Sequence, residues 1–143
     1  MYILPIEFAT PEYDEAVRIR YKVLREPLGL DYTPEQLALE YQDIHLACFN
    51  DQATILGCLI LSEGGEEVLK MRQVAVSPEW QGKGVGRKLV EASEELARQY
   101  NVHKITLNAR DAAIPFYSKL AYLTVGEPFE EVGIKHLKME KFL

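Results

Sequence analysis

The segment QGKGVGRKLV, residues 81–90, places three glycines within five positions, between a strand-like stretch and a helix-like one. The basic residues Lys83, Arg87 and Lys88 lie where that helix would begin. A helix N-terminus carries a partial positive charge, which favours acidic side chains and disfavours basic ones. The clustered cations and the flexible backbone therefore point to an anion bound at this strand-to-helix turn.

Two common nucleotide-binding motifs do not fit these glycines. A dinucleotide fingerprint needs a third glycine, but the corresponding residue is Arg87 when counted from Gly82 and Leu89 when counted from Gly84. A phosphate-binding P-loop needs Ser or Thr directly after its Gly-Lys pair, and none follows here. Both motifs are therefore excluded.

A third pattern, Gln81-x-x-Gly84-x-Gly86, does fit. Glycines allow tight or left-handed backbone turns, so that successive N–H groups form a concave set of donors. The helix that follows adds its own unpaired N–H groups and its dipole. We expect a pyrophosphate in this turn; the alternative is a glycine-rich turn with solvated basic side chains.

Composition limits the remaining possibilities. The chain has 143 residues, 48% of them hydrophobic and 27% charged, so we expect one globular domain over residues 1–143. A net charge of −6 argues against a nucleic-acid partner, and no apolar run is long enough to span a membrane. The start lacks the pattern of a signal peptide, so a cytoplasmic location is expected. Cys48 and Cys58 lie in apolar runs and are expected to be reduced core thiols.

Periodicity and turn signals predict a mixed α/β (α+β) protein. Thr10 and Thr33 are expected helix N-caps, Thr33 forming a capping box with Gln36, and Asp111 is a third candidate cap. The central strand–helix–strand unit requires a crossover, which predicts one parallel pair in a mostly antiparallel sheet. The expected strands are 2–9, 44–50, 53–63, 66–77, 103–109, 122–126 and 133–142, and the expected helices are 10–25, 33–41, 85–100 and 111–121.

Four features resemble the GNAT superfamily of N-acetyltransferases. MRQVAVSPEWQGKGVGRKLV is similar to the family's fourth strand, glycine turn and third helix. ARDAAIPFYSKLAY is similar to its fourth helix, and the element order matches throughout. VLREPLGL and EEVGIKHLKMEK look like a subgroup of small bacterial members. The chain departs from the pattern at Arg110, Ala121 and Lys135, where Asn, Gly and Pro are common.

The resemblance implies a GNAT-type acyl-CoA N-acyltransferase fold, with a mixed, mostly antiparallel sheet of six to seven strands and four helices. Strands four and five would be parallel and splayed. It implies direct transfer of an acetyl group from acetyl-CoA to a primary amine of a small molecule or peptide, without a metal. A noncatalytic acyl-CoA-binding module on the same fold is the alternative. Since GNAT members are often dimers, a homodimer is left open.

The resemblance also assigns residues on the donor side. Tyr117 is the expected acid that protonates the leaving thiolate, and its alternative role is a core aromatic. Asn108, placed at the end of the fifth expected strand, would contact the pantetheine arm or merely end the strand. The expected cofactor-binding residues are Val74, Ala75, Val76, Gln81, Gly82, Lys83, Gly84, Val85, Gly86, Arg87 and Asn108.

The acceptor side is less defined. An amine must be neutral to attack, so desolvation or a general base must assist; Glu130, Glu131 and His136 are candidates. His136 could equally be a solvated strand residue, and the two glutamates plain surface acids. Arg25 and Tyr32 could line the acceptor pocket, with Arg25 either binding an acidic group or interacting with a helix C-terminus.

Overall fold

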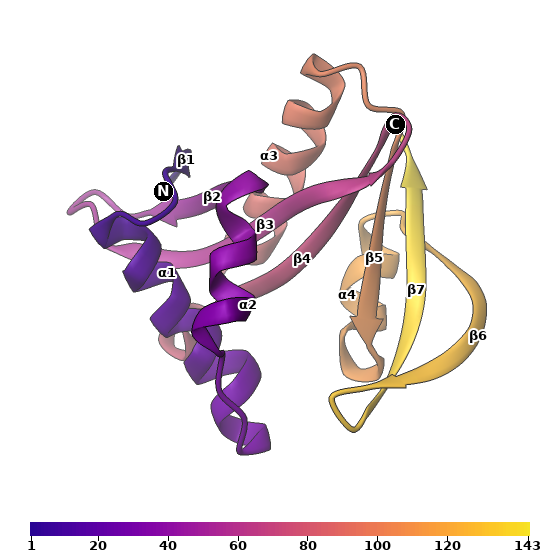
Figure 1. The fold of residues 1–143 in the computed structure, drawn as a ribbon. Helices are drawn as coiled ribbons and strands as arrows, with labels where there is room; N and C mark the ends of the chain where they lie inside the picture. Colours follow the sequence, from indigo (N-terminus) through magenta and orange to yellow (C-terminus); the bar gives the residue numbers. More distant parts are fainter. The chain divides into compact units, whose positions relative to one another are not determined.

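The computed structural model describes residues 1–143, which form two compact units. The first unit contains residues 1–62 and 73–93, and the second contains residues 63–72 and 94–143. The seven strands are hydrogen-bonded in the order β1-β2-β3-β4-β5-β7-β6. Their sequence along the chain, with four α-helices, confirms the expected element order. The elements (Figure 1) are β1 (Tyr2–Ile6), α1 (Pro11–Arg20), α2 (Pro34–Ala38), β2 (Ile44–Phe49), β3 (Ile55–Gly65), β4 (Val68–Val76), α3 (Val85–Gln99), β5 (Lys104–Arg110), α4 (Ile114–Lys119), β6 (Leu123–Glu131) and β7 (Ile134–Phe142).

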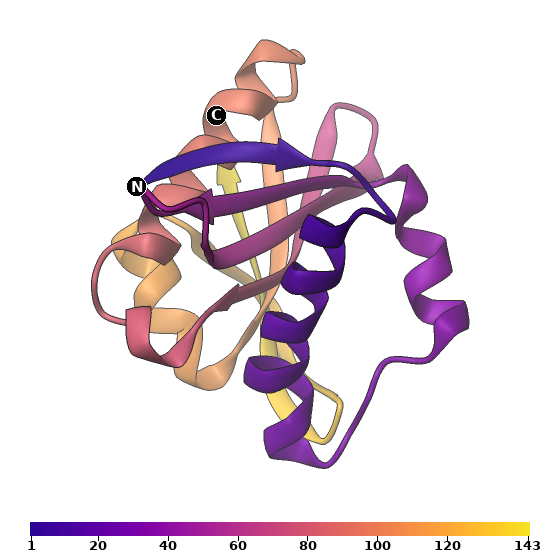
Figure 2. The same ribbon diagram turned by 90° about the vertical axis from the view of Figure 1, so that its left-hand side faces the viewer.

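In the first unit, β1, β2 and β3 form an antiparallel meander, and α1 lies along it (Figure 2). The Thr10 side chain accepts a hydrogen bond from the Tyr13 N–H at 3.2 Å and thereby caps α1, as predicted. On its inner side α1 packs Ala16 against Cys58 of β3 and Ala75 of β4. This apolar contact fixes the helix on the sheet.

The other face of β3 receives the start of α3. Neighbouring residues of a strand point to opposite faces, so Gly57 faces away from the Cys58 side. A Cβ at Gly57 would lie 2.9 Å from the Ala75 carbonyl oxygen and 3.0 Å from Val85 Cγ1. Val85 and Leu89, the first apolar residues of α3, are 1% and 0% exposed. The absent side chain at Gly57 therefore lets the helix begin tightly against the sheet.

In the second unit, β5 pairs antiparallel with β7, and β7 with β6. Residues 68–71 of β4 pair parallel with residues 104–107 of β5, which confirms the predicted parallel pair. Glu94, in the second half of α3, accepts hydrogen bonds from the Tyr122 hydroxyl and from Lys141 Nζ, each at 2.9 Å. A buried carboxylate satisfied by two donors in this way ties α3 to β7.

The ends of two strands, β3 and β6, differ from the expectation. Residues Gly64 and Gly65 belong to β3, and the turn lies at Glu66–Glu67, with Glu67 at φ +58°. A Cβ at Gly64 would lie 3.1 Å from the Lys70 N atom, so this glycine permits close strand approach instead of forming the turn. The expected strand 122–126 continues as β6 to Glu131, with an irregular register between Val125 and Phe129. The Gly-Glu-Pro run there is accommodated because β6 is an edge strand.

Three expected helices also differ at their ends. The α-helix expected at 10–25 ends at Arg20 and continues as a π-helix over Tyr21–Arg25. The helix expected at 33–41 is α-helical only to Ala38, but its predicted capping box is present. Asp111 opens a short 3₁₀ turn and makes no capping bond; its carboxylate lies 3.8 Å from Lys135 Nζ instead.

Both cysteines are free and buried, as expected for core thiols. Burial raises the pKa of the Cys58 thiol to about 12, and it also raises the pKa of Cys48. Neither thiol is therefore a ready nucleophile at neutral pH. The chain contains no helix long and apolar enough to cross a membrane, and no group of three or more His, Cys, Asp or Glu side chains is placed to hold a metal ion.

Candidate active site

The glycine turn between β4 and α3 is open and rich in donors. Gly82 and Gly84 have φ values of +74° and +86°, which side-chain-bearing residues rarely adopt. The N–H groups of Gly82, Lys83 and Gly84 bond to no other backbone group. A Cβ at either glycine would meet nothing within 4 Å. The turn therefore offers unpaired donors beside free space, an arrangement that fits a pyrophosphate.

The turn is anchored to the strand that precedes it. The Gln81 side chain donates from Nε2 to the Val76 carbonyl oxygen at 3.0 Å, and the Trp80 N–H donates to the Ser77 carbonyl at 2.9 Å. The α3 helix that follows has no acidic residue in its first turn. Since no protein carboxylate serves its first N–H groups, the helix N-terminus remains open to an external anion.

The cations near the turn have different surroundings. Arg87 Nε lies 2.9 Å from Glu91 Oε1, an exposed pair one helical turn apart. Lys83 Nζ lies 5.0 Å from the centre of the Trp80 ring, within the range of a cation–π contact. Lys88 forms no ion pair. Local partners thus offset two of the three charges that made this helix start unusual.

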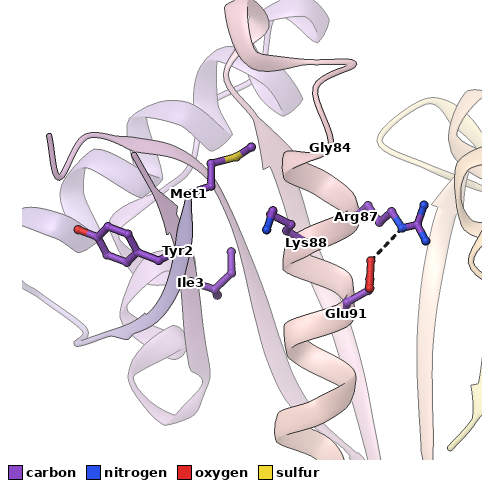
Figure 3. Close-up of a pocket in the computed structure, with 7 residues that line it drawn as sticks. All are labelled: Met1, Tyr2, Ile3, Gly84, Arg87, Lys88 and Glu91. Carbon is purple, nitrogen blue, oxygen red and sulfur yellow. Dashed lines mark hydrogen bonds and ion pairs between the residues drawn. The ribbon is translucent and has the colours of Figure 1, made fainter. Parts of the chain in front are cut away.

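A surface pocket of about 530 Å³ adjoins the turn (Figure 3). Lys88 points from α3 toward β1, whereas Arg87 and Glu91 form their pair on another side of the helix. The pocket shares Gly84 with the turn, so free volume continues from the glycines along the start of α3. Its lining residues are Met1, Tyr2, Ile3, Gly84, Arg87, Lys88 and Glu91.

Strand β4 carries a strained residue directly before the predicted acyl-binding positions 74–76. Gln73 has φ +54°, a left-handed value inside a strand, which costs about 1–3 kcal/mol for a non-glycine residue. Its side-chain Oε1 accepts a hydrogen bond from the Tyr32 hydroxyl at 2.5 Å. Ala75 is 2% exposed, so its side chain is committed to the core.

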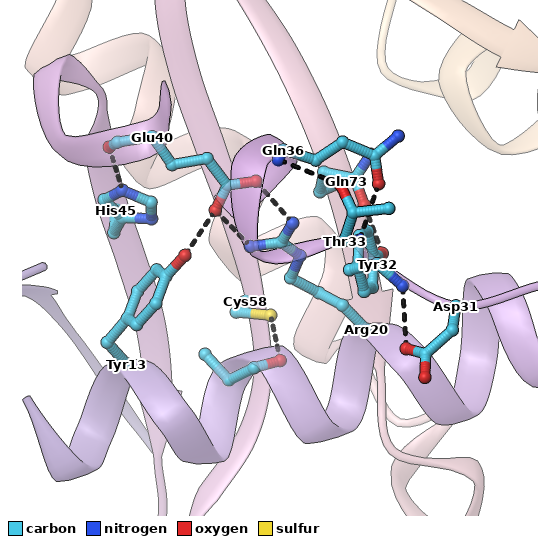
Figure 4. Close-up of polar contacts among 11 residues, drawn as sticks. Tyr13, Arg20, Asp31, Tyr32, Thr33, Gln36, Glu40, His45, Cys58 and Gln73 are labelled. Atoms are coloured by element: carbon cyan, nitrogen blue, oxygen red, sulfur yellow. Dashed lines mark hydrogen bonds and ion pairs between the residues drawn. The ribbon is translucent and has the colours of Figure 1, made fainter. Parts of the chain in front are cut away.

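A buried ion pair supports the segment that carries Tyr32 (Figure 4). Arg20 and Glu40 are 1% and 4% exposed and form two parallel hydrogen bonds of 2.8 and 2.7 Å. The Tyr13 hydroxyl donates to Glu40 Oε1 at 2.8 Å, and His45 Nε2 lies 2.9 Å from the Glu40 carbonyl oxygen. Burial opposes ionisation of both partners, but their mutual contact outweighs it: the pKa of Glu40 is lowered and that of Arg20 is raised.

The structure brings together the two residues expected on the acceptor side of the first unit. The Arg25 guanidinium carbon lies 4.6 Å from the centre of the Tyr32 ring, and that of Arg20 lies 4.8 Å from it. Arg25 ends the π-helix, and such helices occur frequently at functional sites. Sequence reasoning identified Arg25 and Tyr32 but missed Arg20, Gln73 and Glu40. An arginine on the apolar side of a helix, beside Ala16 and Ile19, was the available signal for Arg20.

In the second unit, Tyr117 differs from the other buried tyrosines. The hydroxyls of Tyr13 and Tyr122 donate to Glu40 and Glu94, whereas the Tyr117 hydroxyl makes no hydrogen bond. The ring is 7% exposed, and burial raises the pKa of its hydroxyl above the ordinary value of 10.0. The phenol therefore keeps its proton at neutral pH and has it available for a partner outside the protein.

The acceptor-side candidates of the second unit also meet. His136 is 3% exposed, so it is not a solvated strand residue, and its Nε2 lies 3.6 Å from Glu131 Oε2. Its Nδ1 lies 2.7 Å from the Ile134 carbonyl, an acceptor that fixes the proton on Nδ1 in the neutral ring. Glu130 is exposed opposite Lys135. Asn108 lies opposite Lys138 within β5, two residues before the strand ends and not at its end as expected.

Comparison with known proteins identifies relatives over the full length. A family model described as an acetyltransferase (GNAT) domain matches residues 18–143. The uncharacterised N-acetyltransferase YitI of Bacillus subtilis strain 168 is 24% identical, over 96% of this chain and 97% of that protein. The fold resembles that of a Lactobacillus plantarum protein assigned as an N-acetyltransferase, with a TM-score of 0.85 and 22% identity over 100% and 99% of the two chains. It also resembles an aminoglycoside 6′-N-acetyltransferase complexed with coenzyme A, with a TM-score of 0.81 and 16% identity over 99% and 97%.

Proposed function

The chain belongs to the GNAT acetyltransferase family, and on that premise we propose that this N-acetyltransferase moves an acetyl group from acetyl-CoA directly to the primary amine of a small molecule or peptide. Acyl transfer from coenzyme A is the chemistry of the family. The observation that carries the proposal is the open glycine turn at the start of α3, whose N–H donors have no protein partner. Its place at the end of β4 suits a cradle for the donor's pyrophosphate.

Backbone groups perform most of the donor recognition. The N–H groups of residues 82–84 and of the first turn of α3 bind the pyrophosphate oxygens, and Gln81 holds the turn against β4. Residues 74–76 offer backbone groups to the pantetheine arm. One of their N–H groups points to the thioester carbonyl and stabilises the oxyanion that develops there, which is worth about 3 kcal/mol.

Tyr117 protonates the thiolate that leaves. The phenol is a weaker acid than a thiol of pKa about 8.5, so its hydroxyl acts by donating a hydrogen bond and then its proton to the departing sulfur, and the phenolate regains a proton from solvent. Burial keeps the Tyr117 phenol protonated well above neutral pH, and its hydroxyl has no competing acceptor within the protein. Asn108 contributes to binding of the pantetheine arm.

The amine acceptor must lose a proton before it attacks. We propose His136 as the base, acting through Nε2, because the contact of Nδ1 with the Ile134 carbonyl leaves the Nε2 lone pair free in the neutral ring. Glu131 stabilises the imidazolium that forms after proton uptake. This division of roles gives acid and base to different side chains of the second unit.

The test is a thiol-release assay with acetyl-CoA and a panel of primary amines, combined with thermal melting. Binding to the folded state should raise the melting temperature in millimolar acetyl-CoA. We expect amine-dependent thiol release and an amide product. Tight binding without turnover across the panel would instead support a noncatalytic acyl-CoA-binding module. Unchanged melting in millimolar acetyl-CoA would overturn the donor assignment.

A further inference from the structure

Arg25 is a cation held in place without a counterion. Its guanidinium stacks on Tyr32, and it forms no ion pair or hydrogen bond through its side chain. The nearest acids in the sequence form no ion pair with Arg25: Asp31 accepts the Tyr32 N–H at 2.7 Å, and Glu26 is exposed without a partner. A stacked guanidinium leaves its N–H edge free for in-plane hydrogen bonds. Arg25 is therefore built to bind a planar or tetrahedral oxyanion.

Arg20 contacts the same Tyr32 ring as Arg25, but its role is purely structural. It is 1% exposed and donates two hydrogen bonds to Glu40, so its charge is neutralised in the core. Arg25 is only partly buried and carries an uncompensated charge. Its carbonyl accepts the Leu30 N–H at 3.0 Å, so the helix end is satisfied by backbone and does not require the side chain. An interaction with the helix C-terminus therefore does not account for the position of the Arg25 guanidinium.

Tyr32 connects Arg25 to the donor strand. Its hydroxyl bonds to Gln73, the residue directly before the proposed acyl-binding positions 74–76 (Figure 4). The strained backbone at Gln73 and this bond fix the ring, and the ring fixes the guanidinium. An anion bound to Arg25 would therefore be linked through the Tyr32 side chain to β4, the strand that we propose positions the thioester.

We propose that the acceptor is an amine that also carries an oxyanion, a carboxylate or phosphate, and that Arg25 binds this group while the amine faces the thioester. The inference rests on the proposed acetyl transfer and names its substrate class. The unpaired charge of Arg25 disfavours cationic acceptors such as polyamines. Nearby positive charge also favours the neutral form of the attacking amine, which is the reactive one.

The first experiment compares matched acceptors on the wild-type protein. Thiol release at saturating acetyl-CoA is measured for ω-amino acids of increasing length and their amides, and for glucosamine 6-phosphate and glucosamine. The anionic member should be favoured in kcat/KM by about 10- to 100-fold in the best pair, the range for a charge-assisted hydrogen bond. The carboxylate and phosphate arms distinguish which oxyanion is used.

The second experiment uses Arg25→Gln with Arg18→Gln as its control. Arg18 is an exposed cation on α1, so both variants lose the same net charge. Arg25→Gln should lose about 10- to 100-fold in kcat/KM for the anionic acceptor, with the neutral acceptor and the KM for acetyl-CoA unchanged. Arg18→Gln should change none of these values. Activity on the neutral acceptor shows that each variant is folded.

The outcomes separate the inference from the function on which it rests. Equal rates for anionic and neutral acceptors, or equal losses in the two variants, would overturn the inference and leave acetyl transfer standing. Absence of thiol release with every amine would overturn both. A preference for the neutral member of each pair would contradict the assignment of Arg25 directly.

Discussion

The glycine turn at residues 81–86 and the Arg20–Glu40 pair both belong to the first unit, but they use opposite chemistry. The turn presents unpaired backbone donors to solvent, and its glycines leave free space beside them. The ion pair satisfies its charges inside the protein, with only one enclosed atom, Arg20 Nε, lacking a partner. The turn leaves backbone donors without protein partners, whereas the two charges of the pair satisfy each other. We propose that this difference separates residues that bind a ligand from residues that hold a segment in place.

The largest effect on stability is expected from breaking the Arg20–Glu40 ion pair. Glu40→Gln leaves the Arg20 charge buried without its counterion, which should cost about 3–5 kcal/mol in the free energy of unfolding. Chemical denaturation measures the change. Glu26→Gln, at an exposed acid without an ion pair, should stay within about 0.5 kcal/mol. Similar losses in both variants would show that the pair has no special structural role.

The same pair predicts a pH dependence of stability. The pKa of Glu40 is lowered below its ordinary value of 4.5, so the folded protein binds a proton there less readily than the unfolded chain. Its contribution is therefore complete above pH 4.5 and is lost as pH falls through the lowered pKa. Wild-type stability should fall toward that of Glu40→Gln on acidification. A constant difference between the two proteins below pH 4.5 would contradict this.

Tyr117→Phe tests the unpartnered hydroxyl of the second unit. Removing the proposed acid should lower kcat about 100-fold with little effect on acetyl-CoA affinity or stability, because the hydroxyl bonds to nothing in the protein. Tyr122→Phe is the matched control: it removes the bond to Glu94 and should cost about 1–2 kcal/mol of stability while kcat stays unchanged. Loss of stability in Tyr117→Phe without loss of kcat would reduce Tyr117 to a core aromatic.

Gly84→Asp and Gly84→Asn test whether the glycine turn binds the pyrophosphate. Both place a side chain of similar size at φ +86°, so they share the backbone strain, but only Asp adds a negative charge. Asp should weaken acetyl-CoA binding at least about tenfold more than Asn, because it repels the pyrophosphate. Calorimetric titration gives both affinities. Equal affinities would place the pyrophosphate away from this turn.

The contrast also explains what the sequence could predict. The turn is a local feature, since Gln81, Gly84 and Gly86 lie within six residues and their spacing shows the strand-to-helix connection. The order of elements, the parallel pair and the helix caps at Thr10 and Thr33 follow from equally local patterns, and all were confirmed.

Features that depend on distant partners could not be predicted in this way. Arg20 meets Glu40 across 20 residues, and Tyr32 meets Gln73 across 41. Neither contact has a signature in either segment alone, and the π-helix over Tyr21–Arg25 interrupts a sequence that is regular enough for an α-helix. From the sequence alone, the gap between the expected strands 53–63 and 66–77 suggests a turn at Gly64 and Gly65, because close strand approach and a turn favour the same residue.

A crystal structure with coenzyme A tests the central claim most directly. The account predicts that the pyrophosphate oxygens accept hydrogen bonds from the N–H groups of Gly82 to Gly86, with the pantetheine arm running along residues 74–76. A pyrophosphate bound elsewhere, with the N–H groups of the glycine turn facing only solvent, would contradict it.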